Sequence, residues 1–352
     1  MIHLGFGLYR HMLNPAYYSF ARQCGATHII VHLVDYFGNC NSVINQPVGN
    51  SSGWGDARPD KAIWSVGSLQ KLKEEIEEEG LIFYGIENFN PYDWYDILLD
   101  GPLKNTQMDF LKQIIRNMGE VGIPVMGYNF SLAGVTGRIE GAFARGGAIS
   151  VGMQETDNNP LPDGVVWNMK YAENKENKQQ AACTSDELWN RVTWFLNELL
   201  PIAEEAGVRL AAHPDDPPVP FLRNTPRLII QPSFYGRLRD INPSPNNCFE
   251  YCLGTLTEMT EGNIYEYTDM YARDNRLAYI HLRNVKGKVP MYRETFIDEG
   301  DLDVKRIIKI LNEANYEGVI IPDHTPLMAC NAPWHAGMAY AMGYLKASIS
   351  ND

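Results

Sequence analysis

Short apolar stretches rich in β-branched residues alternate with longer amphipathic segments along almost the whole chain. Such stretches, bounded by turn-forming residues, are typical of β-strands. They lie at residues 3–9, 28–34, 81–87, 124–130, 208–213, 248–253, 277–282 and 318–322. A strand followed by a helix, repeated along the chain, favours an α/β fold.

Capping signals mark the helices between these strands. Pro15 can begin the first helix and Gly25 can end it, because proline suits the first helical turn and glycine suits the residue after the last. A Ser-Asp-Glu sequence begins a long helix at 185–206, which ends at Gly207. The other expected helices span residues 67–79, 106–121, 304–314 and 334–349.

Eight strand-helix alternations in a chain of 352 residues indicate one (β/α)8 TIM barrel, a single domain covering residues 1–352. An open, doubly wound parallel sheet is the alternative. The segments 39–62 and 131–184 are long and polar, and they follow the second and fourth strands. Loops that follow barrel strands lie on the catalytic face, so we expect both segments to cover or extend a pocket.

Composition narrows the classes of partner. Hydrophobic residues make up 45% of the chain, which is enough for a large core. The net charge of −13 opposes binding to nucleic acid or to an anionic membrane. No apolar run of about 18 residues predicts a membrane span, and the N-terminus lacks a secretory signal pattern, so we expect a cytoplasmic protein. The six scattered cysteines are then reduced and available as ligands or nucleophiles.

Four potential metal ligands fall at the carboxyl ends of the last four predicted strands: His213, Cys252, His281 and Asp323. In a barrel these ends converge on one mouth, so residues far apart in sequence can meet. Two imidazoles, a thiolate and a carboxylate suit a divalent cation, without selecting sharply among Mn²⁺, Fe²⁺, Co²⁺ and Zn²⁺.

Each of these residues, taken alone, is more often structural than metal-binding. A single histidine at a strand end usually satisfies a local hydrogen bond, and a single cysteine usually packs as a small apolar group. Their coincidence at the same register of consecutive strands favours a shared metal. His28 and His32 on the second strand have no such support, and we expect them to be structural or to contact a ligand.

Further polar residues surround the predicted ligands. Asp215 and Asp216 follow His213 in a proline-rich turn, where their carboxylates could orient the imidazole or bind substrate hydroxyls. Arg283 lies two residues after His281 and therefore on the same side of the strand, where it could hold a substrate carboxylate. His324 follows Asp323 directly and is a candidate general acid or base.

The third and fourth strands add substrate-binding candidates. Glu87 and Asn129 lie at their carboxyl ends, and Arg138 lies further along the loop after the fourth strand. Carboxylates, amides and guanidinium groups bond sugar hydroxyls in pairs, so these residues favour recognition of a polyol.

Together these segments resemble the D-mannonate dehydratase family of xylose-isomerase-like, metal-dependent barrels, over nearly the entire chain. The matching motifs are Gly25-Ala26-Thr27, Gly80-Leu81, Tyr128-Asn129-Phe130, the proline-rich run 213–218, Cys252-x-Gly254, His281-Leu282-Arg283 and Pro322-Asp323-His324. The resemblance implies that His213, Cys252, His281 and Asp323 bind Mn²⁺. It also implies removal of water from an aldonate to give a 2-keto-3-deoxy acid.

In that reaction the metal and Arg283 would stabilise an enediolate while one group removes a proton and another assists the departing hydroxyl. His324 is our candidate for one proton transfer. The other transfer needs a tyrosine or a metal-bound water, which the sequence does not single out.

Two departures from the family pattern concern the substrate. Ile321 stands where the family has an arginine before Pro-Asp-His-Gly, and Thr325-Pro326 replaces the continuation that contains the glycine. The family's tyrosine in the final loop has no clean counterpart in residues 331–335. Loss of an arginine removes a bidentate carboxylate contact, so the pattern does not fix mannonate itself as the substrate.

The sequence therefore predicts a metal-dependent sugar-acid dehydratase that acts on a small molecule, and it is compatible with a homo-oligomer. A sugar isomerase or epimerase of the same barrel class is the alternative, because a ketose substrate needs no carboxylate clamp. A metal-bearing binding protein without turnover is the reading from a different functional class.

Overall fold

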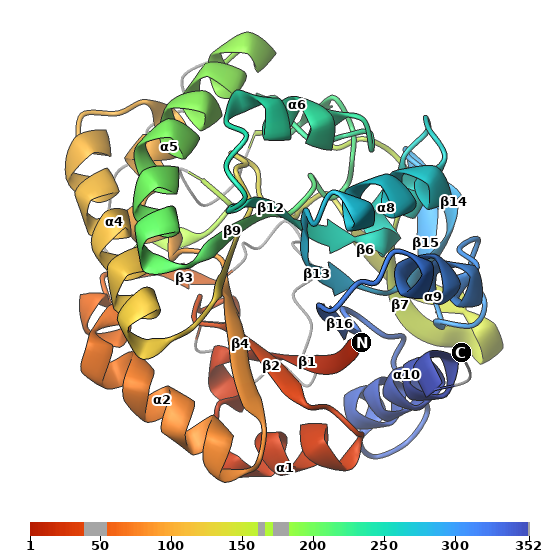
Figure 1. The fold of residues 1–352 in the computed structure, drawn as a ribbon. Helices are drawn as coiled ribbons and strands as arrows, with labels where there is room; N and C mark the ends of the chain where they lie inside the picture. Colours follow the sequence, from red (N-terminus) through yellow and green to blue (C-terminus); the bar gives the residue numbers. More distant parts are fainter. Residues whose placement is uncertain (39–54, 161–165, 172–182, 351–352) are drawn as a thin grey trace.

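A computed structural model of the chain describes residues 1–38, 55–160, 166–171 and 183–350. Its centre is a closed barrel with the strand order β1-β16-β13-β12-β9-β5-β4-β2 (Figure 1). The barrel strands are β1 (His3–Tyr9), β2 (His28–His32), β4 (Ile82–Glu87), β5 (Val125–Tyr128), β9 (Arg209–Ala212), β12 (Asn247–Cys252), β13 (Leu277–His281) and β16 (Val319–Ile321).

These strands confirm the predicted TIM barrel. Each predicted strand overlaps one barrel strand, with bounds that differ by at most two residues at either end. The open-sheet alternative is wrong, because β1 pairs in parallel with both β2 and β16 and so closes the sheet.

Helices surround the barrel in a ring (Figure 1). They are α1 (Pro15–Gln23), α2 (Val66–Glu78), α3 (Tyr95–Leu99), α4 (Lys104–Val121), α5 (Ser185–Ala206), α6 (Phe234–Ile241), α7 (Leu253–Glu258), α8 (Ile264–Arg273), α9 (Val304–Glu313) and α10 (Pro333–Ser350). Short 3-10 turns lie at Arg10–Met12, Lys61–Trp64, Pro91–Asp93 and Arg145–Gly147. Within the part of the chain that the structure describes, no helix is both long and apolar enough to cross a membrane.

Local sequence explains where the helices begin and end. The Thr184 side chain and Glu187 form a reciprocal capping box at the start of α5. Gly207 ends this helix with a φ of 68°, a left-handed conformation that glycine adopts without steric cost. Asn14 caps α1, whose first residue is Pro15.

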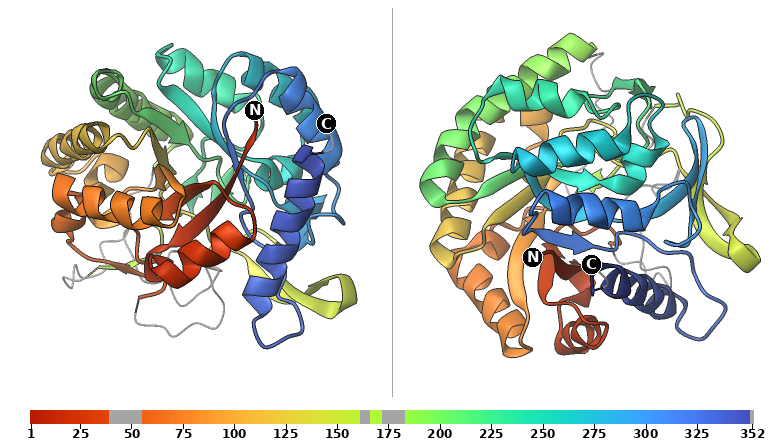
Figure 2. Two further views of the ribbon diagram at one scale, coloured as in Figure 1. Left: turned by 60° about the horizontal axis from the view of Figure 1, so that its bottom comes forward. Right: turned by 45° about the vertical axis from the view of Figure 1, so that its right-hand side comes forward.

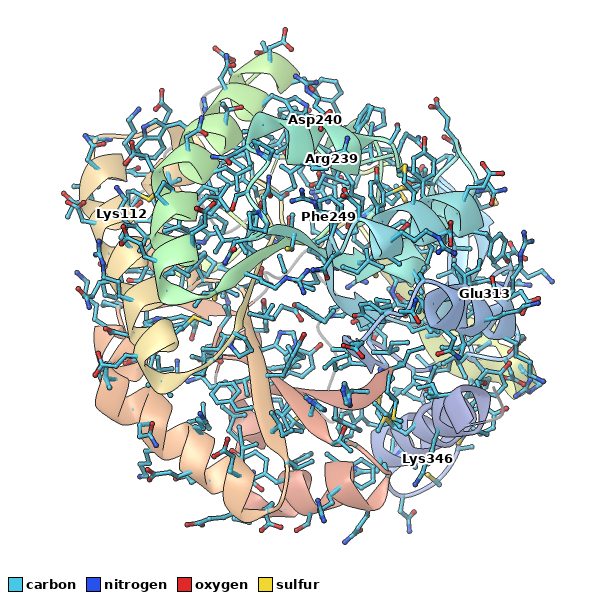
Figure 3. All side chains as sticks on the ribbon, viewed as in Figure 1. Lys112, Arg239, Asp240, Phe249, Glu313 and Lys346 are labelled. Carbon is cyan, nitrogen blue, oxygen red and sulfur yellow. The ribbon has the colours of Figure 1, made fainter. Side chains whose placement is uncertain are left out.

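Apolar side chains fill two layers. Outside the strands, Phe249 of β12 packs against Tyr235 and Tyr271, with ring centroids 4.4 and 5.0 Å away. Figure 3 shows Phe249 near the barrel wall, whereas Lys112, Glu313 and Lys346 lie on the outer helices. Inside the barrel, small and branched residues form a separate buried cluster that includes Ile30, Val125, Ala211, Ala278 and Val319. The interior is therefore packed, and the chemistry is confined to one mouth.

A second sheet lies beside the barrel. The segment after β5 contains β6 (Ile139–Ala144) and β7 (Ala148–Met153), which join the hairpin of β14 (Asn284–Lys288) and β15 (Met291–Thr295) in the order β14-β15-β7-β6. The β6–β7 hairpin projects beyond the barrel (Figure 2). The other short strands are β3 (Asp56–Ala57), β8 (Lys170–Tyr171), β10 (Phe221–Leu222) and β11 (Thr225–Pro226).

The sheet formed by β6, β7, β14 and β15 was not predicted from the sequence, in which residues 131–184 stand out only as a long polar segment. Parts of the two expected pocket-covering segments, residues 39–54, 161–165 and 172–182, lie outside the described residues.

Arg227 ties together the segments that follow β5 and β9. Its guanidinium donates to the Ser131 hydroxyl at 2.9 Å and to the carbonyl oxygens of Gly134 and Asp216 at 2.8 and 2.9 Å. Its Nε also pairs with Asp215 Oδ1 at 2.9 Å, and the Arg227 side chain is fully buried. The ion pair therefore fixes both segments at the barrel mouth.

We expect Arg227→Met to lower the free energy of unfolding by about 3–5 kcal/mol, because it leaves the buried Asp215 carboxylate without its partner. Urea unfolding at neutral pH measures this change. Arg239→Met is the matched control: Arg239 and Asp240 form a pair on α6 that is open to solvent (Figure 3), so its loss should change stability by less than about 1 kcal/mol. Equal stability of the two variants would contradict this role for Arg227.

Candidate metal centre and active-site cavity

A cavity opens at the carboxyl ends of the barrel strands. Residues at or just beyond these ends line it: Tyr9, His32, Glu87, Asn129, His213, His281, Asp323 and His324. The neighbouring loops add Tyr36, Asn88, Val135, Arg138, Trp167 and Asp216. Parallel strands that close into a barrel bring these distant parts of the sequence to one mouth.

The structure brings together the four residues predicted as metal ligands. Donor atoms of His213, Cys252 and His281 all lie within 4.8 Å of one another. Asp323 completes the group, with Oδ1 3.8 Å from His281 Nδ1 and Oδ2 3.9 Å from the Cys252 sulfur.

The geometry of these side chains fits a divalent cation. His281 Nδ1 is buried and has no hydrogen-bond partner in the described part of the chain. His213 Nδ1 lies 2.6 Å from the Pro214 carbonyl oxygen, to which it donates, so Nε2 remains for a ligand bond. A nitrogen, sulfur and oxygen donor set of this kind suits Mn²⁺, Fe²⁺, Co²⁺ or Zn²⁺.

In the metal-free protein, the pKa values of these side chains decide which of them are ionised. Burial opposes ionisation of Cys252, but Arg283 and the two imidazoles lower the pKa of its thiol to about 6. Burial lowers the pKa of His213, but Glu250 and Cys252 raise it to about 9. Burial also opposes protonation of His281, but Glu87 and Asp323 raise its pKa well above the usual value. The thiolate is thus ready to bind a metal, whereas the imidazoles of His213 and His281 must first lose a proton.

Two glutamates contact the opposite side of the His281 ring. Nε2 of His281 lies 3.1 Å from Glu87 Oε2 and 3.3 Å from Glu250 Oε1. Burial and the charge of Glu87 raise the pKa of Glu250 to about 8, so Glu250 holds a proton at neutral pH. Despite its own burial, Glu87 has a lowered pKa because His32 and His281 lie beside it. Ionised Glu87 therefore accepts a hydrogen bond from Nε2 and directs Nδ1 toward Cys252 and Asp323.

Glu250 is a residue of this site that was not predicted from the sequence. Glu250 precedes Cys252 by two residues, and alternate residues of a strand lie on the same face. This spacing could have identified Glu250 as a neighbour of the predicted ligands. Gly127 leaves the space that this carboxyl group needs, since a Cβ there would lie 2.6 Å from both Glu250 Oε2 and the Tyr279 hydroxyl.

The structure revises the predicted role of Arg283. Its Nε donates to Asp323 Oδ2 at 3.0 Å, Nη1 donates to Glu258 at 2.8 Å, and Nη2 donates to Asp216 at 2.8 Å. Nη2 also donates to the Thr255 hydroxyl at 3.1 Å, and the side chain is only 1% exposed. Because its donors already have protein partners, Arg283 positions Asp323 rather than holding a substrate carboxylate.

Asp215 is also excluded from substrate contact. One carboxylate oxygen pairs with Arg227, and the other accepts from the backbone amides of Leu228 and Ile229 at 2.7 and 2.9 Å. Asp215 does not line the cavity among the described residues. Its role is to hold the turn after β9, whereas its neighbour Asp216 faces the cavity.

Arg138 brings a positive charge to the cavity wall. Nη1 lies 3.6 Å from Asp216 Oδ2 and 3.5 Å from Glu294 Oε1, and the side chain is almost fully buried. These spacings exceed those of direct hydrogen bonds, so the two carboxylates orient the guanidinium through charge. Asn129 lines the same cavity and offers an amide.

His324 lies between two carboxylates. Nδ1 is 3.0 Å from Glu294 Oε1 and Nε2 is 3.2 Å from Asp323 Oδ1. Glu294 comes from β15 of the second sheet, and the sequence analysis missed it because it did not predict the β14–β15 hairpin. The arrangement fixes the imidazole at the cavity wall.

The two histidines of β2 have different surroundings. His32 lines the cavity and lies 3.5 Å from Glu87 Oε2, and burial lowers its pKa. His28 lies at the other end of the strand, where Nδ1 is 2.8 Å from the Thr27 hydroxyl. The structural role expected for His28 agrees with this contact.

Comparison with known proteins identifies relatives of the chain. A family model described as D-mannonate dehydratase (UxuA) matches residues 30–141 and 153–347. The mannonate dehydratase of Lactococcus lactis subsp. lactis is 29% identical over 290 residues, which cover 76% of this chain and 80% of that protein. That of Streptococcus suis is 29% identical over 275 residues, which cover 74% of each.

Solved structures share the fold. The mannonate dehydratase from Streptococcus suis serotype 2 superposes with a TM-score of 0.75 at 24% identity, covering 99% of this chain and 94% of that one. A structure of L-ribulose 3-epimerase superposes with a TM-score of 0.57 at 12% identity, covering 100% and 95%. These likenesses support the barrel architecture.

Cys252→Ser should lower the bound metal per chain at least tenfold, because a neutral hydroxyl replaces a thiolate donor. Metal analysis after gel filtration measures this loss. Cys248→Ser is the matched control: Cys248 is buried on the same strand but contacts Arg209 and the Pro245 carbonyl, so its metal content should stay at the wild-type level. Unchanged metal in Cys252→Ser would remove the sulfur from the site.

Metal binding should release protons. At pH 7 the His213 imidazole, with a pKa of about 9, is protonated in the metal-free protein and must be neutral to bind a cation. Although burial lowers it, Glu87 and Asp323 raise the pKa of His281 well above its usual value, so this imidazole must lose a proton as well. The apparent affinity for Mn²⁺ should therefore rise at least tenfold per pH unit between about pH 6 and 9. Calorimetric titration of metal-free protein in buffers of different ionisation enthalpy measures the protons released, and an affinity independent of pH would contradict this account.

Proposed function

Because the chain belongs to the D-mannonate dehydratase family, we propose that it is a metal-dependent hydro-lyase that removes water from an aldonate to give a 2-keto-3-deoxy acid. The observation that carries this proposal is the convergence of His213, Cys252, His281 and Asp323 beside a cavity that also contains Arg138 and His324.

The four converging side chains would hold the ion, for which we propose Mn²⁺, with Fe²⁺, Co²⁺ and Zn²⁺ as chemical alternatives. When bound, the ion supplies a Lewis acid that stabilises negative charge developing on the substrate. Arg283 and Glu87 support this centre from outside, since each contacts one of the ligands and fixes its orientation.

Arg138 would hold the substrate carboxylate. It lines the cavity, whereas the described lining does not include Arg283, whose nitrogens donate to Asp323, Glu258 and Asp216. Asn129 and Asp216 also line the cavity and would bind substrate hydroxyls. Ile321, which stands where the family has an arginine, packs into the apolar interior of the barrel. The carboxylate contact of this chain therefore moves from β16 to the loop after β5.

His324 would transfer the proton at C2. Hydrogen on the carbon next to a carboxylate is weakly acidic, so its removal needs a positioned base. Glu294 and Asp323 contact opposite nitrogens of this imidazole and restrict its rotation. The same contacts keep its ring beside Asp323, one of the four side chains that would hold the ion.

We also propose that residues 1–352 form one domain. Its support is that the largest core cluster has buried members from Ile2 to Leu345. A small sugar acid as the substrate follows from the family, whereas the cytoplasmic location and the oligomeric state stay predictions from the sequence.

A sugar isomerase or epimerase is the second candidate, because solved epimerases such as that for L-ribulose share the barrel. Metal-loaded protein should convert mannonate or another aldonate to a product in which C3 is a methylene and C2 a ketone, as observed by NMR. Ketohexoses incubated in parallel should stay unchanged. A rearranged sugar as the sole product would reject the dehydratase.

His324→Ala should lower kcat by about 10²–10⁴-fold, the usual contribution of a positioned acid or base, while the metal content stays at the wild-type level. Steady-state kinetics and metal analysis measure both quantities. His335→Ala is the control, because His335 lies on α10, packs against Tyr17 and is absent from the cavity lining. A binding protein without turnover predicts instead that the wild type consumes no substrate and that His324→Ala retains ligand affinity.

A further inference from the structure

Elimination of water needs a proton donor as well as a base. The leaving hydroxyl at C3 is a poor leaving group until it receives a proton. His324 accounts for one transfer, and the sequence left the other unassigned. Tyrosines surround the cavity, so the state of each hydroxyl decides which of them can act.

Most of these hydroxyls already make a hydrogen bond within the protein or lie in another pocket. Tyr36 accepts a hydrogen bond from the Asn88 amide at 3.0 Å. Tyr279 donates to Glu87 at 3.3 Å, and Tyr292 donates to Asp216 at 3.4 Å. Tyr128 is buried and lines a separate, smaller pocket behind β5 and β9. Tyr279, Tyr292 and Tyr128 therefore present no uncommitted donor to the cavity, and the Tyr36 hydroxyl is held in place by Asn88.

Tyr9 is different. It lines the cavity, and its hydroxyl makes no hydrogen bond with any residue that the structure describes. It is the last residue of β1, a strand that pairs on one side with β2 and on the other with β16. The chain that leaves β16 reaches Asp323 and His324 two and three residues later. Tyr9 thus lies at the same mouth as the proposed base.

Aromatic contacts fix the Tyr9 ring. Its centroid lies 4.6 Å from that of His32, 5.3 Å from that of Phe37 and 6.3 Å from that of His11, whose ring is stacked with it. A ring held on several sides keeps its hydroxyl in one place. Such pre-positioning is what general acid catalysis requires.

We propose that Tyr9 donates the proton to the departing C3 hydroxyl, a proposal that rests on the dehydratase function above. His324 takes the proton from C2, and the C2–H electron pair becomes the C2=C3 double bond. The C3–O bond breaks, and its electron pair leaves with the oxygen, which takes the Tyr9 proton and departs as water. The enol then becomes the 2-keto-3-deoxy acid, and the tyrosinate regains a proton from His324 or from solvent.

Burial raises the pKa of Tyr9 well above its usual value, and the charges of Asp323 and Glu87 raise it further. The Tyr9 hydroxyl therefore keeps its proton at neutral pH.

Tyr9→Phe should lower kcat on the aldonate by about 10²–10⁴-fold, because it removes the donor and keeps the ring. KM should stay within about threefold of the wild-type value, and metal content should be unchanged. Tyr17→Phe on α1, whose ring contacts Trp334 and His335, is the control with wild-type kinetics expected.

A substrate with a better leaving group separates catalysis from a structural effect. Fluoride departs with little need of a proton, so Tyr9→Phe should release fluoride from the 3-deoxy-3-fluoro aldonate within about tenfold of the wild-type rate. Equal losses on both substrates, or full dehydration of the aldonate by Tyr9→Phe, would overturn the role of Tyr9 while leaving the dehydratase intact. A wild-type protein inactive on both substrates would overturn the dehydratase and this proposal with it.

Discussion

Charge buried at one end of the barrel is the constraint on which the site depends. Closure of the parallel strands collects many ionisable side chains in a small volume with little water, where an unpaired charge is costly. The carboxyl groups are those of Glu87, Asp216, Glu250, Glu258, Glu294 and Asp323, and Arg138 and Arg283 are the arginines among them. The negative charges that the carboxylates and the Cys252 thiolate can carry outnumber the positive charges of the two arginines. Burial raises the pKa of Glu250 and of Glu258, and neighbouring acidic groups raise the pKa of His213 and of His281, so protons held on these groups reduce the excess of negative charge. A divalent cation bound here would replace the protons of the two imidazoles.

The elements that sequence reasoning identified correctly are those whose signals are local. β-branched runs bounded by glycine and proline marked the barrel strands, and the capping sequence before Glu187 marked α5. The convergence of His213 with Cys252 followed from one topological rule, that the carboxyl ends of barrel strands meet. Because that rule concerns the whole fold, a correct strand assignment was enough to place the four side chains together.

The missing parts depend on contacts between distant segments. Glu294 pairs with Val285 in the β14–β15 hairpin, and this hairpin joins β7 through Tyr292 and Met153, which are 139 positions apart in the chain. Strand patterns do not specify such distant partners, so the contact of Glu294 with His324 was not predicted. Strand alternation placed Arg283 correctly on the side of His281. The role of Arg283 depends on Asp216, which follows β9, and on Glu258, the last residue of α7. The side of a strand on which a side chain lies can thus be predicted from the sequence. Which of several nearby groups that side chain will bind cannot.

The site divides into a part built on the barrel and a part built on loops. His213, Cys252, His281 and Asp323 stand on barrel strands or directly after them, so their spacing is set by a rigid scaffold. Arg138 precedes β6, and Glu294 lies on β15, so both belong to the second sheet or its entry. Ile321, at the strand position where the family resemblance predicts an arginine, packs into the apolar barrel interior. In the proposed function, recognition of the substrate therefore lies with the loops and the metal-assisted chemistry with the barrel.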